Sequence, residues 1–570
     1  MLVYGDHAST IEVAAALGGV AAALSEAQCA SRPHRHEHLT RAFIDASGVA
    51  QGLIDAEFDA RGADDLSPLH AAAMAMLAVL ARGLAGGTAP GREILAGLTA
   101  LTLPRTVTVR TPEGYAFYAV YPEAYAQSAA AWPWRAPPLV IGVRSIGTGL
   151  AAAVGAAAGA ATVLTVRPTG HPFARTLRLT PALRELIAAH RGPFAVADEG
   201  PGLSGSSFGC VADLLEDLGV EPERIVFFPS HGNDVGARAS PRHRARWRQA
   251  QRPVRTLDDL LREQPIGAWF GDVVGEVERV EDLSAGAWRE ALSADACDPP
   301  PADPLRERRK FRLSSPRGQY IARFAGLGAT GEAKLAPAKA LHAAGFAPEP
   351  LALRRGFLLQ GWEAGDPLPP GPPPPDFVEH LGRYLAFRAR DLPAGSDQGA
   401  SVEALTEMAC ANARELLGER QGAELAQRLQ ELAPGEIGRR VHVDGRLHRW
   451  EWLRRPDRSY SKLDALDHSQ AHDLIGCQDI AWDVAGAAAE FDLAPGEVAQ
   501  IIATIERARV AVAAESLAFF GACYAAFQGG LWAMAEAAAP PAEQAAVARH
   551  RRRYRERLSA LASYAAARVG

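Results

Sequence analysis

Short apolar runs alternate with helical patterns from about residue 106 to residue 230, and this alternation constrains the fold more than any other feature. The runs LVIGV, TVLTV, FAVA and IVFF are each followed by turn residues and then by a stretch with helical character. Strands that alternate with helices pair in parallel, and ligands bind at the carboxyl ends of such strands. The sequence therefore predicts a parallel sheet with a binding site along one edge. RTVTVRT and GYAFYAVY, just before these runs, also have the character of strands.

Residues 194–209, FAVADEGPGLSGSSFG, place a glycine-rich loop between an apolar strand and a helix. The loop contains G-x-G-x-x-G, which is typical of dinucleotide sites. Such a site also needs an acid at the end of the next strand, but that strand ends in Phe-Pro-Ser at 228–230. Two acids, Asp198 and Glu199, stand beside the glycines instead. This arrangement favours a phosphorylated sugar, because carboxylates accept hydrogen bonds from its hydroxyls and the N–H groups that open a helix bind its phosphate.

The same segment resembles the type I phosphoribosyltransferase family, whose signature is an apolar strand, two acids, a short spacer and a turn of small residues. The spacer is one residue longer here, and Ser204 stands where Thr is usual. The resemblance implies phosphoribosyl diphosphate (PRPP) as substrate, with Asp198 and Glu199 on the ribose hydroxyls and Mg²⁺ bridging the ribose and the pyrophosphate. It implies phosphate binding by Gly200, Gly202, Ser204, Gly205, Ser206 and Ser207.

Two further segments lie where that family would have its other loops. Residues 140–151, VIGVRSIGTGLA, resemble its pyrophosphate loop, and residues 167–179 occupy the place of its mobile loop. The first would bind the diphosphate and the second would stabilise departing pyrophosphate, as cationic clamps do elsewhere. The residues that the resemblance assigns are Arg144, Ser145, Gly147 and Thr148 in the first loop and Arg167, His171 and Arg175 in the second.

A second pattern follows a proline-rich linker. His442-x-Asp444, followed by the acids within residues 461–491, resembles the aminoglycoside phosphotransferase and choline kinase group. Over about 310–560 the resemblance implies a two-lobed α+β fold, with Asp444 accepting the proton of the substrate hydroxyl and ATP as phosphate donor. The metal ligand would be Asp467, or Asp464 in the alternative register.

Several positions depart from that group. The Asn expected five residues after the base is Arg449, and Arg323 stands where a Lys should touch the nucleotide phosphates. A guanidinium does not replace an ammonium group without consequence. Four histidines lie among the acids, which leaves open a transition-metal centre instead of polar loop residues around a Mg²⁺ site. They are His442, His448, His468 and His472.

Composition limits the class of protein. The chain has 48% apolar and 22% charged residues and a formal net charge of −6, so neither a nucleic acid nor an anionic membrane is expected as partner. Six cysteines without C-x-x-C, and an N-terminus without the plan of a signal peptide, fit a cytoplasmic protein. The uncharged stretch between Arg144 and Arg167 is expected to be a buried helix followed by a strand. Small molecules are the expected partners, and a homodimer stays open.

The sequence as a whole predicts an α/β protein with four parts. These are a helical segment (1–105) serving as hood or scaffold, a phosphoribosyltransferase-like parallel-sheet domain (106–294), a linker (295–310) and a kinase-like domain (311–570) with a hinge near 360–377. The favoured function is a PRPP-dependent transferase, with an unidentified acceptor, fused to an ATP-binding kinase-like module. The alternatives are a regulator that senses PRPP or a nucleotide, and a small-molecule kinase with an inactive ribose-phosphate domain.

Overall fold

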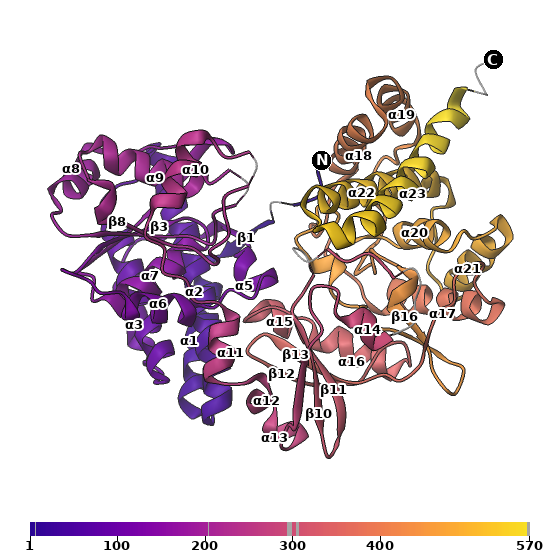
Figure 1. Cartoon of the computed structure of the whole chain (residues 1–570), viewed down its shortest axis with the longest axis horizontal. Helices are drawn as coiled ribbons and strands as arrows, with labels where there is room; N and C mark the ends of the chain where they lie inside the picture. The colour runs from indigo at the N-terminus through magenta and orange to yellow at the C-terminus, as the bar shows by residue number, and fades with distance from the viewer. Residues whose placement is uncertain (6, 203, 237, 293–298, 304–306, 567–570) are drawn as a thin grey trace.

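The computed structural model has an N-terminal and a C-terminal half that lie side by side (Figure 1). It describes residues 1–5, 7–202, 204–236, 238–292, 299–303 and 307–566. Part of the predicted linker at 295–310 and one cysteine, Cys297, therefore lie outside the described residues.

Helices form most of the first hundred residues, as the sequence predicts. The long ones are α1 (Val13–Cys29), α2 (Arg32–Arg61) and α3 (Pro68–Gly86), followed by the short turns η1 (Arg92–Leu95) and α4 (Ala96–Thr99). α3 begins where the Ser67 hydroxyl accepts a hydrogen bond from the His70 N–H group. Strand β1 (Ala8–Glu12) pairs antiparallel with β2 (Thr106–Arg110), so this segment is tied to the part of the chain that follows it.

The predicted parallel sheet is present in the N-terminal half. Its strand order is β4-β3-β7-β8, and each neighbouring pair is parallel. The strands are β3 (Leu139–Val143), β4 (Thr162–Val166), β7 (Phe194–Ala197) and β8 (Ile225–Phe228). Every residue of β3, β7 and β8 is buried, which explains their continuous apolar sequences. The crossover helices are α7 (Gly147–Ala158), α8 (Pro181–Ala189) and α9 (Ser206–Asp217).

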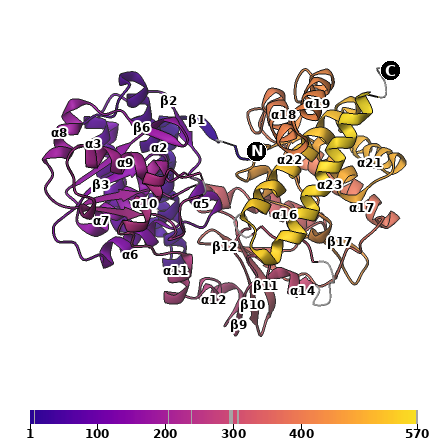
Figure 2. The same cartoon turned by 45° about the horizontal axis from the view of Figure 1, so that its top comes forward.

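One expected strand is a helix instead. GYAFYAVY is residues 114–121, and its first four residues together with Glu113 form α5 (Glu113–Phe117). Helix α6 (Pro122–Ala131) follows. The carbonyl of Pro112 accepts hydrogen bonds from the N–H groups of Tyr115 and Ala116, so the chain turns where its aromatic residues suggested an extended run. Figures 1 and 2 both place α5 between the two halves.

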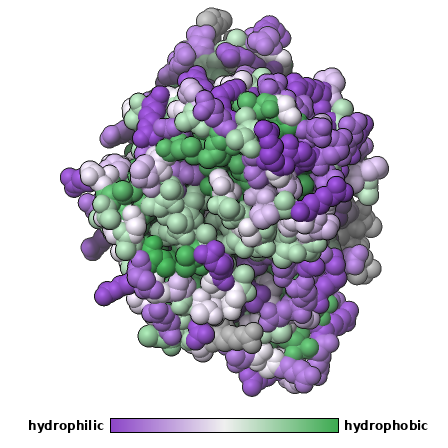
Figure 3. All heavy atoms as spheres, turned by 90° about the vertical axis from the view of Figure 1, so that its left-hand side faces the viewer, coloured by the Kyte–Doolittle hydropathy of each residue, from purple (hydrophilic) through white to green (hydrophobic). Residues whose placement is uncertain are grey.

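Smaller elements complete this half. A hairpin, β5 (Pro168–His171) with β6 (Ala174–Leu177), extends from the end of β4. Four short helices follow β8: α10 (Pro241–Gln249), α11 (Leu257–Glu263), α12 (Ile266–Trp269) and α13 (Gly271–Val274). Within the part of the chain that the structure describes, two helices, Pro68–Gly86 and Ala514–Ala538, are long and apolar enough to span a membrane. The most apolar segments of these helices are 56% and 72% buried inside the protein, as in the core helices of globular proteins, so the evidence for a membrane span is weak. On the face of the N-terminal half that Figure 3 shows, apolar patches are interrupted by polar residues.

The C-terminal half begins with an antiparallel sheet of order β12-β13-β11-β10-β9. Its strands are β9 (Arg279–Asp282), β10 (Lys310–Ser315), β11 (Gly318–Phe324), β12 (Pro350–Arg354) and β13 (Phe357–Gly361). β9 falls within the range predicted for the preceding domain, yet it is an edge strand of this sheet. The sheet is accompanied by α14 (Trp288–Leu292), α15 (Ala329–Glu332) and α16 (Leu335–Ala343).

A helical lobe follows the sheet. Its helices are α17 (Pro375–Asp391), α18 (Val402–Leu417), α19 (Glu419–Leu432), α20 (Ala481–Phe491), α21 (Pro495–Arg507), α22 (Leu517–Ala538) and α23 (Pro541–Ala566), with η5 (Ala514–Ser516). Between them run small strands and turns: β14 (Asp366–Pro367), β15 (Arg440–Val441), η3 (Arg449–Glu451), β16 (Trp452–Arg454), β17 (Tyr460–Lys462), η4 (His468–Gln470) and β18 (Gln478–Asp479). A core of aromatic and aliphatic side chains holds these helices together.

Candidate functional site

A cavity of about 260 Å³ lies where the antiparallel sheet, the helical lobe and α5 meet. The sheet contributes Lys310, Ile321 and Arg323, and α22 contributes Gln528 and Trp532. Phe117 of α5, the adjacent Tyr118, and Tyr4 close to the N-terminus complete the lining. Residues from both halves of the chain therefore enclose one cavity.

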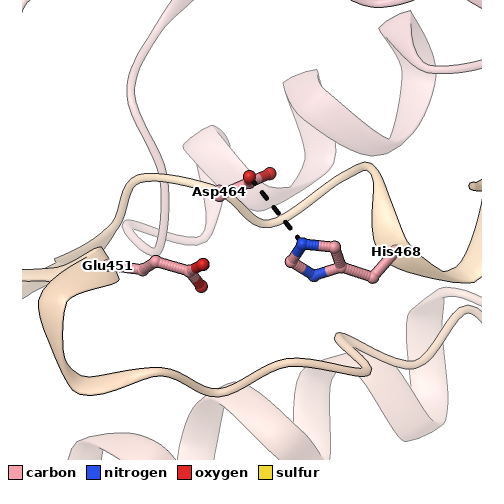
Figure 4. A group of neighbouring side chains, drawn as sticks. All are labelled: Glu451, Asp464 and His468. Carbon is pink, nitrogen blue, oxygen red and sulfur yellow. Dashed lines mark ion pairs between the residues drawn. The ribbon is translucent and has the colours of Figure 1, made fainter. Parts of the chain in front are cut away.

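Two carboxylates and an imidazole converge in this cavity (Figure 4). One possible ligand atom from each of Glu451, Asp464 and His468 lies within 4.8 Å of the others. Glu451 ends η3, Asp464 follows β17, and His468 begins η4, so three successive turns of the chain supply the group. Two carboxylate oxygens and an imidazole nitrogen form a donor set that suits a divalent cation.

The His468 ring has a defined orientation. Its Nδ1 lies 2.9 Å from the backbone carbonyl oxygen of Asp444, which can only accept a hydrogen bond, so Nδ1 carries a proton. Its Nε2 faces the Asp464 carboxylate at 3.8 Å. In the neutral ring Nε2 therefore has the free lone pair and directs it into the group, as a metal-binding histidine does.

Cations balance Asp464. Arg323 Nη1 lies 2.8 Å from Asp464 Oδ1. Burial by itself would raise the pKa of Asp464, but Arg323 and His468 outweigh it and hold the pKa below its usual range. Arg323, which stands where a lysine was expected, is thus paired with Asp464, the alternative metal ligand.

Asp467 lies in a different environment. Its carboxylate pairs with the ammonium group of Lys334, which is 1% exposed, and lies 3.5 Å from Arg308 Nε and 3.8 Å from Arg323 Nε. Burial and the nearby Arg308 lower the pKa of Lys334 to about 8, although Asp467 opposes them. The sequence analysis named Asp467 as the first choice for a metal ligand and Asp464 as the alternative. In the structure Asp464 lies beside Glu451 and His468, whereas Asp467 pairs with basic side chains.

Asp444 is not among the described residues that line the cavity. Its side chain is buried, accepts a hydrogen bond from the Tyr384 hydroxyl, and lies 3.3 Å from Lys462 Nζ. The backbone N–H group of Asp444 donates to the carboxylate of Asp483, which lies in the first turn of α20. The sequence predicted that Asp444 takes a proton from the substrate, and this role stays a prediction; in the structure its backbone carbonyl contacts the His468 ring.

The remaining histidines are dispersed. His442 contacts Cys477 Sγ at 3.3 Å, and His448 lies 3.4 Å from the Glu490 carboxylate. His472 contacts the other half of the chain: its Nδ1 lies 2.7 Å from the Tyr118 hydroxyl and its Nε2 lies 3.0 Å from Glu113. Of the four histidines, only His468 joins the described group of metal-binding side chains.

The acid pair of the N-terminal half lies at the carboxyl end of β7. Burial raises the pKa of Asp198 to about 7, although the Glu199 N–H group donates to it. Burial, Glu113 and Asp198 raise the pKa of Glu199 to about 8. The Glu199 carboxylate accepts a hydrogen bond from the Gly114 N–H group at 2.9 Å, and a Cβ at Gly114 would lie 2.9 Å from that carboxylate. A side chain at 114 would therefore displace the acid.

The glycine loop opens α9 as expected. Gly205 has a φ of 62°, in the left-handed region, and α9 begins at the next residue. The hydroxyls of Ser204 and Ser206 both donate to the carbonyl of Pro172 in the β5–β6 hairpin, at 3.1 and 2.6 Å. The hairpin thus rests on the loop that was predicted to bind phosphate. The other predicted loop residues, Gly200, Gly202 and Ser207, lie in the same turn and the first turn of α9.

Two of the predicted pyrophosphate ligands are directed elsewhere. The Arg144 side chain is fully buried and donates to Asp55 at 2.8 Å and to Asp64, both of which come from the helical segment. Arg167 donates to the same Asp55 and to the Arg144 carbonyl. The sequence placed both arginines at the diphosphate, whereas their charges are compensated by acids that it did not consider.

The small residues of the first loop are close-packed. Ser145 lies in the turn before α7, and its carbonyl accepts a hydrogen bond from the Thr148 N–H group at 3.1 Å. A Cβ at Gly147 would lie 2.8 Å from the carbonyl oxygen of Ala197, so α7 can approach β7 only with glycine there. Arg175 on β6 is the basic residue that most stabilises the charge of Asp198. Among the described ion pairs, Arg175 has no carboxylate partner, whereas Arg144 and Arg167 both pair with Asp55. Arg175 therefore differs from the other two predicted arginines, because its charge acts on the acid pair.

No family model and no curated protein sequence matches the chain. Among solved structures, the choline kinase LicA from Streptococcus pneumoniae is similar at 14% identity over 52% of this chain and 99% of its own, with a TM-score of 0.34. Spectinomycin phosphotransferase APH(9)-Ia, solved with ADP and spectinomycin, is similar at 10% identity over 53% and 98%, with a TM-score of 0.36. A type I macrolide 2'-phosphotransferase is similar at 14% identity over 51% and 96%, with a TM-score of 0.33.

Proposed function

We propose that the C-terminal half binds a nucleoside triphosphate together with a divalent cation and transfers a phosphoryl group to a small molecule. The observation that carries the proposal is the convergence of Glu451, Asp464 and His468 inside a cavity that arginines also line. Phosphoryl transfer needs mainly positioning and charge compensation, and this cavity offers both signs of charge within one enclosed space.

The residues present fit a divalent cation. Glu451 and Asp464 offer carboxylate oxygens, which Mg²⁺ prefers, and the His468 nitrogen also suits Mn²⁺. A bound cation would neutralise charge on the phosphates. Glu451 already accepts a hydrogen bond from Lys462, which limits the carboxylate to few orientations.

Basic and apolar side chains of the same cavity suit the two ends of a nucleotide. Arg308 and Arg323 are directed to the acids and can attract phosphate oxygens. Ile321, Leu453 and Leu463 offer apolar surface of the kind that packs against a nucleobase. Asp444 contributes indirectly, because its carbonyl fixes the His468 ring.

Nucleotide binding tests this proposal. Titration of the full chain with ATP and Mg²⁺ in a calorimeter should show binding, and Glu451→Gln or Asp464→Asn should weaken it at least tenfold by removing one cation ligand. Glu349→Gln, at an exposed acid immediately before β12, is the matched control and should bind as the wild type does. Equal affinity in all four proteins would refute the assignment of the cation site.

We propose a second site, for PRPP, at the carboxyl edge of the parallel sheet. It is favoured by a specific observation: Glu113, which is partly exposed, lies near Asp198 and Glu199, and burial raises the pKa values of Asp198 and Glu199 to about 7 and about 8. Their charge is under-compensated by the protein, so hydroxyl groups and a divalent cation would stabilise it. The loop that opens α9 is adjacent and can bind the 5-phosphate.

Calorimetry with PRPP and Mg²⁺ tests the second site. Wild-type protein should bind, whereas the double variant Asp198→Asn/Glu199→Gln should lose at least tenfold in affinity. Asp217→Asn, at the exposed end of α9, is the control. Binding followed by pyrophosphate release with a base identifies a transferase, and binding without release across a panel of bases identifies a regulator. Absence of binding by the wild type would refute the site.

A further inference from the structure

Gln528 is a buried side chain whose hydrogen-bonding groups are unused. It lies on α22, is 0% exposed and lines the cavity of the C-terminal half. Both its carboxamide oxygen and its carboxamide nitrogen lack a hydrogen-bond partner. Among the described residues, no other buried side-chain amide lacks a partner at both ends. Leaving such a buried group unpaired destabilises the fold, so an apolar residue would suit this helix better unless something binds there.

Trp532 repeats the observation one turn later on the same face of α22. It is 8% exposed, lines the same cavity, and its indole Nε1 also lacks a partner. Leu531 lies between them on that face and lines the cavity too, so the face carries no charge. Two donor groups and one acceptor group on this uncharged face of the cavity therefore lack partners within the protein.

Aromatic rings surround this end of the cavity. The rings of His448 and Trp450 are stacked with centroids 4.4 Å apart, and the Trp532 ring lies 6.2 Å from His448. All three side chains line the cavity. Glu490 holds His448 from behind at 3.4 Å, which fixes this wall. Such a wall binds the face of a planar ring.

We propose that Gln528 and Trp532 form a subsite for the acceptor, and that the acceptor is an uncharged planar ring with a lactam or carboxamide edge, such as a nucleobase. A carboxamide presents its donor and its acceptor side by side, and a lactam N–H and C=O match them in two parallel hydrogen bonds. The inference rests on the proposed phosphotransferase function and names the substrate class of that site.

Ligand-detected NMR with simple lactams tests the subsite. Uridine, which has a free lactam N–H, should bind to the full chain, whereas 3-methyluridine, in which that N–H is blocked, should bind at least about tenfold more weakly. Gln528→Met should remove this difference between the two nucleosides. Gln500→Met, an exposed glutamine of α21, should retain it. Failure of uridine and of 2-pyridone to bind at millimolar concentration would overturn the proposal.

A stability measurement separates the subsite from a structural role for Gln528. Because its amide is unpaired without ligand, Gln528→Met should leave the melting temperature of the free protein unchanged or higher. A clear decrease would show that the amide has a partner within the protein and would overturn the inference. The outcome is distinguishable from failure of the proposed function, because uridine binding does not require ATP, Mg²⁺, Glu451 or Asp464.

Discussion

Arg144→Met is expected to destabilise the N-terminal half, because the arginine neutralises buried acids. Arg144 donates to Asp55, to Asp64, and at 3.1 Å to the carbonyl of Thr165. After the substitution Asp55 keeps its bonds from Arg167. Asp64 is 3% exposed and would keep only the backbone N–H group of Arg167. The loss therefore falls mainly on Asp64.

The size of the loss follows from the charge left on Asp64. Removing one partner of a buried ion pair costs about 3–5 kcal/mol. Protonation of the Asp64 carboxyl limits the destabilisation, because the neutral form needs no ionic partner. At about pH 7 this protonation costs at most about 4 kcal/mol, since each pH unit above about 3.9 costs about 1.4 kcal/mol. Burial outweighs Arg144 and already raises the pKa of Asp64 in the wild type. The free energy of unfolding of the N-terminal half is therefore expected to decrease by about 3 kcal/mol at pH 7.

The loss must depend on pH in one direction. Without Arg144 the folded-state pKa of Asp64 rises further above its unfolded value. A raised carboxyl pKa destabilises the fold above the unfolded pKa, and this penalty disappears as the pH falls toward about 4. The difference between variant and wild type should shrink to about 1 kcal/mol at about pH 5.

Hydrogen exchange of peptides that cover α2 and β3 measures this free energy for the N-terminal half alone. At pH 7 these peptides should exchange about a hundredfold faster in Arg144→Met than in the wild type. The double variant Arg144→Met/Asp64→Asn should recover most of the loss, and Arg82→Met, on the exposed face of α3, should show none. Exchange within about threefold of the wild type at pH 7 would refute the structural role of Arg144.

Three further predictions follow from the contacts. Ser204→Ala/Ser206→Ala should speed hydrogen exchange in the β5–β6 hairpin and not in α9, because the hairpin loses both bonds to Pro172; unchanged exchange would contradict those bonds. Burial would raise the pKa of Glu490, but His448 and other partners lower it to about 2. A lowered carboxyl pKa stabilises the fold above about pH 4.5, and this stabilisation is lost as the pH falls through about 2. Glu490→Gln lacks about 3 kcal/mol of it at neutral pH, so the free energy of unfolding should fall less with acid in this variant than in the wild type. His472→Ala should increase protease cleavage next to α5, and an unchanged cleavage pattern would show that His472 does not hold it.

The parallel sheet could be predicted because its information is local. β3, β7 and β8 are apolar runs buried on both faces and bounded by turns, so their sequence pattern identifies them. The same reasoning failed for residues 113–117, where aromatic residues are typical of a strand but Pro112 starts a helical turn. Local propensity and local hydrogen bonding conflict there, and the second determines the structure.

The site was less predictable, because a side chain's role depends on partners that lie far along the chain. The His-x-Asp spacing led to the prediction for Asp444, but Tyr384 and Lys462, which contact its buried carboxylate, cannot be recognised from that spacing. Glu451 was missed altogether. The available signal was its position, an acid seven residues after Asp444 and immediately before the apolar strand β16. Arg144 is a similar case, since its partners, Asp55 on α2 and Asp64 in the segment after α2, lie 89 and 80 residues earlier in the chain.

The cavity also depends on residues that its own half does not supply. The Tyr4 ring stacks on His472 at 4.5 Å, and the N–H group of Gly5 donates to the His472 carbonyl. Glu113 pairs with the same histidine, while the next residue, Gly114, binds Glu199 of the acid pair. α5 thus contacts both candidate sites within two residues. A fragment that starts at the linker would lack Tyr4, Gly5 and α5, so its cavity would lose part of its wall. Weak nucleotide binding by such a fragment would therefore reflect the missing wall and would not count against the cation ligands, which is why each test requires the full chain.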